Sequence, residues 1–120
     1  MSRVRPNKLV SSTVPQENKA DATYSDTEIT IKEHQNGDTL SEFEIDVTTI
    51  FDGTAPKASI GIDSNHEKYL TEDQCYLKAT GTYIIEDTEI LSANETIKLF
   101  ITPDGSTQGV LSGTVRFLDT

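Results

Sequence analysis

The stretch Glu42-Phe43-Glu44-Ile45-Asp46-Val47-Thr48-Thr49-Ile50-Phe51 decides the fold class of this chain. Phe43, Ile45, Val47, Thr49 and Phe51 occupy alternate positions, four of them apolar, and Glu42, Glu44, Asp46 and Thr48 occupy positions of the other series. An α-helix would distribute these residues around its whole circumference, whereas a β-strand places alternate residues on opposite faces. The stretch is therefore predicted to be a strand with one face in a core and the other in solvent.

Shorter segments with the same period of two lie before and after it, separated by turn sequences such as Asn36-Gly37 and Pro103-Asp104-Gly105. The positions that define them are Ile29 and Ile31; Ala58, Ile60 and Ile62; Cys75, Leu77 and Ala79; Tyr83 and Ile85; Ile97, Leu99 and Ile101; and Leu111, Val115 and Phe117. Residues 63–73 are expected to be a polar connection, and residues 86–94 have room for one short helical turn. The chain is predicted to be all-β, an antiparallel β-sandwich or jelly roll of about seven to eight strands.

The charge changes sign along the chain. Residues 1–19 carry four basic residues and one acidic residue, whereas residues 20–120 carry six basic and nineteen acidic residues. Pro6 and Pro15 disfavour helix in the first part and restrict their neighbours to extended conformations. We predict two parts, an extended basic N-terminal arm (1–19) and a β-sandwich domain (20–120).

The basic arm is the best candidate for a binding element, although short basic termini are often simply unordered. Residues 9–14 could add as a strand to a sheet in their own subunit or in a neighbouring one. Attraction by the cations would be salt-sensitive, so backbone pairing and apolar burial would supply most of the affinity. The predicted partner-binding residues are Arg3, Arg5, Lys8, Leu9 and Val10.

The net charge of −10 argues against nucleic acid and against anionic membrane surfaces as partners. Leu9-Val10 is too short an apolar run for a signal peptide, and no stretch has the length of a membrane span. We therefore expect neither a nucleic-acid partner nor a membrane partner, and synthesis in the cytoplasm.

Metal binding is not predicted. The two histidines, His34 and His66, are placed in separate turns, and the single cysteine gives no zinc-binding spacing. Asp63, Asn65 and Glu67 begin like a calcium loop, but a lysine follows where such a loop needs its glycine. No cofactor is expected, and the acidic residues are interpreted as a solvated negative face.

Catalysis is not predicted either. The sequence contains no nucleophile elbow and no phosphate-cradling glycine loop, and Cys75 is interpreted as a small buried apolar residue. Carbohydrate binding usually relies on exposed aromatic rings, but tryptophan is absent. Tyr24, Tyr69 and Tyr76 are the remaining candidates for a sugar platform, although a scattered set of tyrosines is more often half-buried packing. The chain is predicted not to be an enzyme.

Three runs resemble small β-rich virion proteins of tailed bacteriophages and prophages. They are Glu44-Ile45-Asp46-Val47-Thr48-Thr49-Ile50-Phe51-Asp52-Gly53-Thr54-Ala55-Pro56, then Ile60-Gly61, and then Leu77-Lys78-Ala79-Thr80-Gly81-Thr82-Tyr83. In that family a V-T-x-x-F-D-G-T-x-P strand and turn precede an I-G strand and a later L-x-x-T-G-x-Y. The segment Gly113-Thr114-Val115-Arg116-Phe117 is similar to the family's C-terminal strand. The acidic stretches 63–73 and 86–89 depart from the more neutral family pattern, which leaves the location in the virion open.

The resemblance implies a non-enzymatic structural component of a phage particle, and a capsid decoration or cement protein fits best. Such a protein would be made in the host cytoplasm and would sit on the capsid surface of the virion. Its implied partners are the major capsid protein and itself, as a homodimer or homotrimer. Two alternatives stay open: another virion component (a head-fibre base, tail or connector subunit), or a carbohydrate-binding module.

Overall fold

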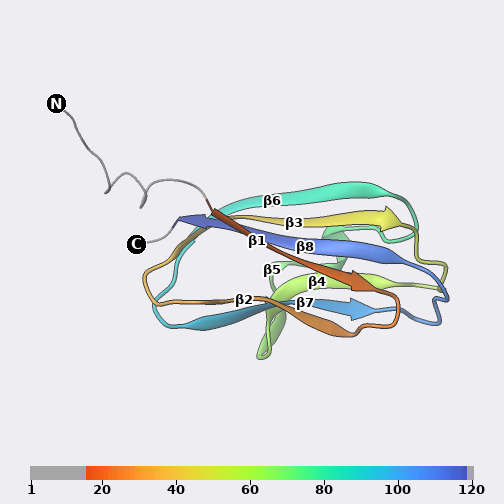
Figure 1. Cartoon of the computed structure of the whole chain (residues 1–120), viewed down its shortest axis with the longest axis horizontal. Coiled ribbons are helices and arrows are strands. Elements are labelled where there is room, and N and C mark those ends of the chain that lie inside the picture. The colour runs from red at the N-terminus through yellow and green to blue at the C-terminus, as the bar shows by residue number, and fades with distance from the viewer. Residues whose placement is uncertain (1–15, 119–120) are drawn as a thin grey trace.

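The structure is a computed structural model that describes residues 16–118, in which eight β-strands and one short 3-10 helix follow one another (Figure 1). The elements are β1 (Gln16–Thr23), β2 (Glu28–His34), β3 (Thr39–Thr49), β4 (Lys57–Ile62), β5 (Asn65–Leu70), η2 (Glu72–Gln74), β6 (Gly81–Ile90), β7 (Glu95–Thr102) and β8 (Val110–Leu118). The predicted all-β class and strand number are confirmed.

The strands form two four-stranded sheets, and every pair of neighbours is antiparallel. The first sheet has the order β1-β8-β3-β6, and the second has the order β2-β7-β4-β5. Apart from β4 to β5, each connection crosses from one sheet to the other. This interlocked order is that of a jelly roll. The sequence predicted either a simple β-sandwich or a jelly roll, and the strand order identifies the jelly roll.

The core lies between the two sheets and is built from the inward residues of both. Phe43, Ile45 and Val47 of β3 are buried, as the alternation predicted, while the acidic residues between them face outward. Full burial of each such side chain contributes roughly 1.5–3 kcal/mol. β3 is hydrogen-bonded to β8 on one side and to β6 on the other, so this strand organises the first sheet.

The predicted strand at Cys75–Ala79 is wrong. These residues form an irregular connection that crosses the end of the sandwich before β6 begins at Gly81. Leu77 is buried there, and its carbonyl accepts a hydrogen bond of 2.8 Å from the backbone N–H of Phe51. The alternation arose because the loop directs Leu77 into the core, not because it pairs with a strand.

The predicted polar connection 63–73 is also wrong, because it contains the edge strand β5. The first three residues of β5 are exposed on both faces, so they carry no apolar alternation. His66 lies in this strand rather than in a turn, with its ring stacked on Phe100 at 3.8 Å between centroids. His34 ends β2 and is fully buried. β6 continues through 86–89 as a strand, so no helical turn forms before Ile90.

At the N-terminal side, β1 was not foreseen. It pairs with β8 from Gln16↔Phe117 to Thr23↔Val110. The last four residues of the predicted arm, 16–19, therefore form the first half of the edge strand β1. The predicted partner-binding residues Arg3, Arg5, Lys8, Leu9 and Val10 lie outside the described residues.

Candidate interaction surface

The acidic body and the basic segment next to it have opposite charge. Residues 1–15 carry three basic residues and no acidic residue, whereas residues 16–118 carry seven basic and nineteen acidic residues. A body with this imbalance attracts cationic segments and repels other acidic bodies. Each basic side chain of the body neutralises the carboxylates that it pairs with, so the negative potential is exposed where acidic side chains lie away from these pairs.

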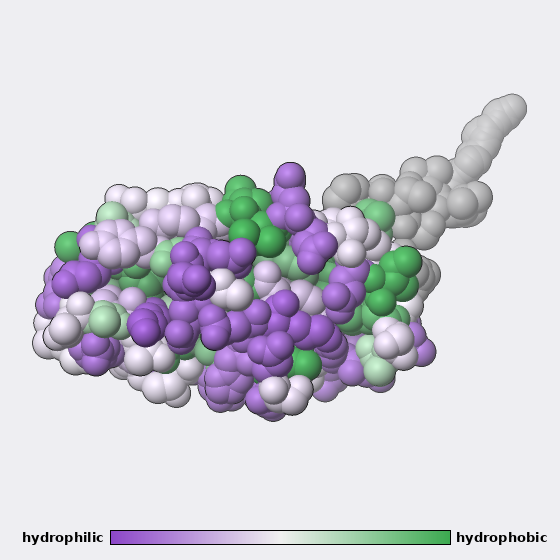
Figure 2. Space-filling view, turned by 180° about the vertical axis from the view of Figure 1, so that it is seen from behind, coloured by the Kyte–Doolittle hydropathy of each residue, from purple (hydrophilic) through white to green (hydrophobic). Residues whose placement is uncertain are grey.

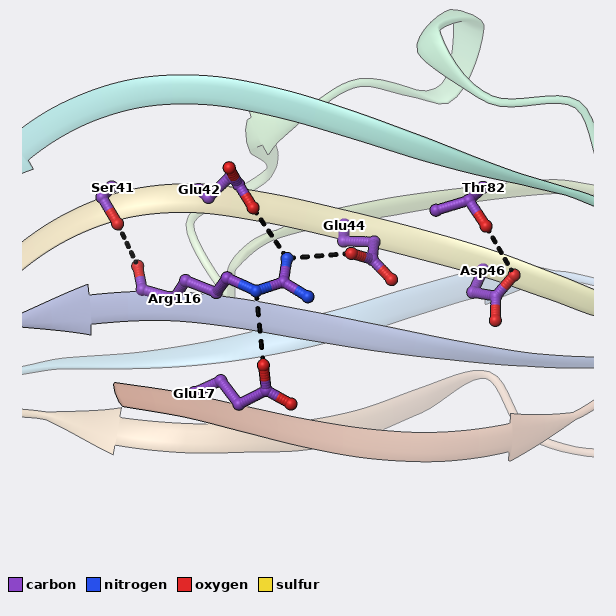
Figure 3. Close-up of polar contacts among 7 residues, drawn as sticks. All are labelled: Glu17, Ser41, Glu42, Glu44, Asp46, Thr82 and Arg116. Atoms are coloured by element: carbon purple, nitrogen blue, oxygen red, sulfur yellow. Dashed lines mark hydrogen bonds and ion pairs between the residues drawn. The ribbon is translucent and has the colours of Figure 1, made fainter. Parts of the chain in front are cut away.

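Arg116 of β8 lies on the outer face of the first sheet, among three carboxylates (Figure 3). Its Nη1 lies 2.8 Å from Oε1 of both Glu42 and Glu44, and its Nε lies 3.3 Å from Oε1 of Glu17. Hydrogen bonding to Glu44 is the largest of the effects that raise the pKa of this guanidinium. The cluster ties β1, β8 and β3 together, and its cation is already saturated.

Lys98 and Lys68 are saturated in the same way. Lys98 Nζ lies 2.9 Å from Oε2 of Glu28 and 3.0 Å from Oδ1 of Asp63. Lys68 pairs with Glu95 and with Glu89, which also accept hydrogen bonds from the Tyr69 hydroxyl. Because Glu89 belongs to β6 and Tyr69 to β5, this second cluster joins the two sheets along one open margin.

The outer edge of β6 has no strand beside it within residues 16–118. β6 pairs only with β3, and no hydrogen bond from residues 16–118 reaches the backbone groups on its other side. Ile84 and Ile90 point outward from this strand with exposed fractions of 49% and 69%. Acidic side chains at Glu86 and Asp87 are exposed between them.

The other three edge strands of the described sheets do not combine these features. β1 alternates charged residues of both signs outward, and β2 and β5 present polar side chains at their exposed positions. None of the three exposes a large apolar side chain. Figure 2 shows a mostly hydrophilic face from behind, and hydrophobic side chains reach its upper margin, the side on which Figure 1 places β6. Exposed edges of this kind are templates for strand addition.

The alternation in the sequence does not predict this surface. Tyr83 and Ile85 indicate a strand that ends at the acidic stretch 86–89. The available signal was Ile84 and Ile90, which lie on the opposite face of the same strand and are exposed. Single exposed apolar residues are common on protein surfaces, so this signal gains meaning only when the strand is known to be the edge of a sheet.

A pocket of about 430 Å³ lies at the end of the sandwich, between the loop after β3 and the connection that follows η2. It is lined by Thr54, Ala55, Pro56, Lys57, Glu72, Cys75, Tyr76 and Lys78. Tyr76 is 59% exposed, and Tyr24 is exposed elsewhere, so two of the three candidate sugar-platform tyrosines reach the surface. Tyr69 does not, because it is buried with its ring stacked on Phe43 at 4.4 Å.

The loops at this end of the sandwich are fixed by side-chain caps. Asp52 accepts hydrogen bonds from the backbone N–H and the hydroxyl of Thr107 at 2.6 and 2.7 Å, and these bonds lower the pKa of the Asp52 carboxyl. The Ser106 hydroxyl accepts a bond of 2.8 Å from the backbone N–H of Gly53. The adjoining pocket residues Thr54 and Ala55 are held as well, because their backbone N–H groups donate to the carbonyl and the carboxylate of Asp104 at 3.2 and 2.7 Å.

The titratable groups of the described region show no arrangement for chemistry. Burial raises the pKa of the Cys75 thiol to about 11, so it is protonated and weakly nucleophilic at neutral pH. His34 Nδ1 lies 3.2 Å from Oδ2 of Asp38, inside the core. Residues 16–118 hold no group of three histidine, cysteine or acidic side chains placed to bind a metal. Nor does this part of the chain contain a helix long and apolar enough to cross a membrane.

Comparison with known proteins gives likeness of fold only. No family model and no curated protein matches the sequence. A chain of the acidic stable capsid structure of Helicobacter pylori bacteriophage KHP30 is similar in structure, with a TM-score of 0.71, 11% identity, and coverage of 88% of this chain and 87% of that one. A chain of the cyanophage Pam1 capsid asymmetric unit has a TM-score of 0.65 and 9% identity, with coverage of 88% and 85%. Both are chains of about this size.

Proposed function

We propose that this chain is a bacteriophage capsid decoration, or cement, protein. The observation that carries the proposal is the likeness to chains from two phage capsids over nearly the full length of all three chains. Because the aligned part makes up most of those chains, the likeness is not to one domain of a large shell subunit. Small chains of this kind are the size expected for accessory subunits on a shell.

In the proposed mechanism, the jelly roll is a rigid body and residues 1–15 form the attachment element. Arg3, Arg5, Lys8, Leu9 and Val10 contact neighbouring subunits, which are major capsid proteins and other copies of this chain. Binding to the assembled shell, and not to free capsid subunits, stabilises the shell by mass action. The virion is then the final location, and the chain has a structural rather than a catalytic role.

Shell binding provides the test. Undecorated phage shells assembled from a candidate major capsid protein are mixed with this protein and sedimented. Deleting residues 2–15 leaves β1 whole and is expected to abolish co-sedimentation, whereas the full-length chain binds and raises the melting temperature of the shells. A shortened chain that still decorates shells would exclude the role of the N-terminal segment.

Residue-level variants sharpen this test. Charge reversal at Arg3, Arg5 and Lys8 is expected to weaken shell binding, most strongly at low salt, because screening already reduces such attraction at high salt. Reversal of Lys19, which lies in β1, is the matched control and is expected to leave binding unchanged.

Particle imaging separates decoration from the other virion roles. A decoration protein occupies many equivalent positions over the shell, whereas a head-fibre base, tail or connector subunit would appear at a few. A carbohydrate-binding module is favoured only by the exposed Tyr76 beside the pocket. Specific hits on a glycan array that Tyr76→Ala removes would support that role instead.

A further inference from the structure

We propose that residues 9–14 of one copy add as an antiparallel strand to the outer edge of β6 in a second copy, with Leu9 opposite Glu86 and Lys8 beside Asp87. This inference deepens the proposed function, because it names the surface that receives the N-terminal segment when copies contact each other. It rests on the open edge of β6, on the length and charge of residues 1–15, and on the position of Gln16 in the sheet.

β6 offers a regular edge of limited length. Its pairing with β3 keeps one register from Gly81↔Val47 to Glu86↔Glu42 and then shifts by one residue before Glu89↔Leu40. An extra residue at such a bulge disturbs the strand and twists it. The regular part that can accept a new strand is therefore the six residues Gly81–Glu86.

The N-terminal segment contains a stretch of matching length. Leu9-Val10-Ser11-Ser12-Thr13-Val14 is uncharged, contains three β-branched residues, and is bounded by Pro15 on one side and Lys8 on the other. Residues of this type favour strands, and proline is suited to the end of an edge strand. In the proposed register Ser11 lies opposite Ile84, and Leu9 lies diagonal to it on the same face.

Charge selects the antiparallel direction. With Leu9 opposite Glu86, the chain continues through Lys8 past Asp87, an exposed acidic residue. Glu89, farther along β6, already pairs with Lys68. A parallel strand would place Lys8 beyond Gly81, away from the acidic end of β6. The antiparallel direction therefore brings unlike charges together, and antiparallel pairing is also slightly the more stable per residue.

The strand order shows why the segment must come from another copy. Residues that pair directly across the four strands of the first sheet form rows. One row consists of Gln16, Phe117, Leu40 and Glu89, and another consists of Ala22, Leu111, Val47 and Gly81. The two rows are six residues apart along β1, about 20 Å. Residues 14 and 16 of one chain are at most about 7 Å apart. Val14 of the same copy consequently cannot lie opposite Gly81.

Disulfide trapping between two different single-cysteine variants tests the contact. In a Cys75→Ser background, full-length Ser11→Cys protein is mixed with full-length Ile84→Cys protein and mildly oxidised. Directly opposite residues of an antiparallel pair have the Cα separation that a disulfide needs. We expect a covalent heterodimer, and at least about tenfold less product when Thr30→Cys, on the exposed face of β2, replaces Ile84→Cys.

Three results would overturn the inference. They are a cross-link yield no higher than that of the β2 control, a predominant Ile84→Cys homodimer, which would indicate β6-to-β6 pairing, or an intrachain link alone when both cysteines are in one chain. No shells are present in this assay. Its failure would therefore refute the contact between copies, whereas failed shell binding with successful trapping would refute the proposed function.

A charge exchange gives a second readout in solution. Lys8→Glu and Asp87→Lys are each expected to raise the dissociation constant for self-association about fivefold, measured by sedimentation, since each replaces an attraction by a repulsion. The double variant is expected to recover the original constant. Asp21→Lys, on the edge strand β1, is the matched control. A double variant that associates no better than the weaker single variant would contradict the proposed register.

Discussion

Gly109→Ala is expected to destabilise this jelly roll strongly, because it combines an unfavourable backbone conformation with a clash in the core. Gly109 has φ of +148°, a conformation that other residues rarely adopt. A Cβ atom there would lie 2.5 Å from Cγ of Phe51, whose ring is fully buried. Backbone strain costs about 1–3 kcal/mol, and overpacking of a core costs a similar amount. The combined loss is about 3 kcal/mol or more, or a fall of about 12 °C in melting temperature.

Substitutions at two other glycines separate the cost of backbone strain from the cost of overpacking the core. Gly105 has φ of +84°, but a Cβ there would meet no atom within 4 Å, so Gly105→Ala should cost only the backbone term of about 1–2 kcal/mol. At Gly81 the nearest atom would be Tyr83 Oη at 3.6 Å, an ordinary contact. Gly81→Ala should therefore change stability by less than about 1 kcal/mol, with either sign.

The assay is equilibrium unfolding in urea, with the denaturant slope compared between variants so that changes in the denatured state are recognised. The expected order of loss is Gly109→Ala, then Gly105→Ala, then Gly81→Ala. A Gly109→Ala protein within about 1 kcal/mol of the wild type would refute the close approach of residue 109 to the Phe51 ring. It would also question the loop arrangement at this end of the sandwich.

Three further predictions concern ionisable groups. The pKa of Asp52 is lowered by its bonds to Thr107, so the stability it contributes is present above the unfolded value and is lost as the pH falls through the folded one; Asp52→Asn should flatten the acid side of the stability–pH curve measured by thermal unfolding. Alkylation of Cys75 by iodoacetamide should be slow at pH 7 and accelerate towards pH 11, because only the thiolate reacts; fast labelling at pH 7 would show that the thiol is not shielded. Arg116→Met should cost about 1 kcal/mol in urea unfolding at low salt and less at high salt, since it leaves Glu44 and its neighbours unneutralised while salt screens their repulsion.

Local alternation predicted the strands that have one buried face and one solvated face. In β3 the apolar positions Phe43, Ile45 and Val47 are separated by acidic residues, and the period of two alone assigns each side chain to a face. The same signal located β7 and β8. Turn residues such as Asn36-Gly37 then separated the strands, which was sufficient for an all-β sandwich.

The failures occurred where alternation had another cause or was missing. Leu77 alternates because a loop carries it into the core, whereas β5 is an edge strand whose first residues face solvent on both sides. β1 was missed because most of its side chains, from Gln16 to Asp21, are only half-buried or exposed. In these segments, pairing with an adjacent strand, and not the local sequence pattern, decides whether the backbone forms a strand.

The candidate docking surface divides in the same way. The basic, apolar-ended segment with Arg3, Arg5, Lys8, Leu9 and Val10 is visible in the linear chain as a change of charge and composition. The sequence does not show that β6 is an edge strand. This follows only from the strand order, in which β3 pairs with β6 on one side and with β8 on the other, which leaves Ile84 exposed and the outer backbone groups of β6 unpaired within the described sheets. A period of two specifies which face a side chain occupies but not which strand lies beside it. Strand order depends instead on hydrogen bonds between residues far apart in the chain, and these exist only in the assembled sheets.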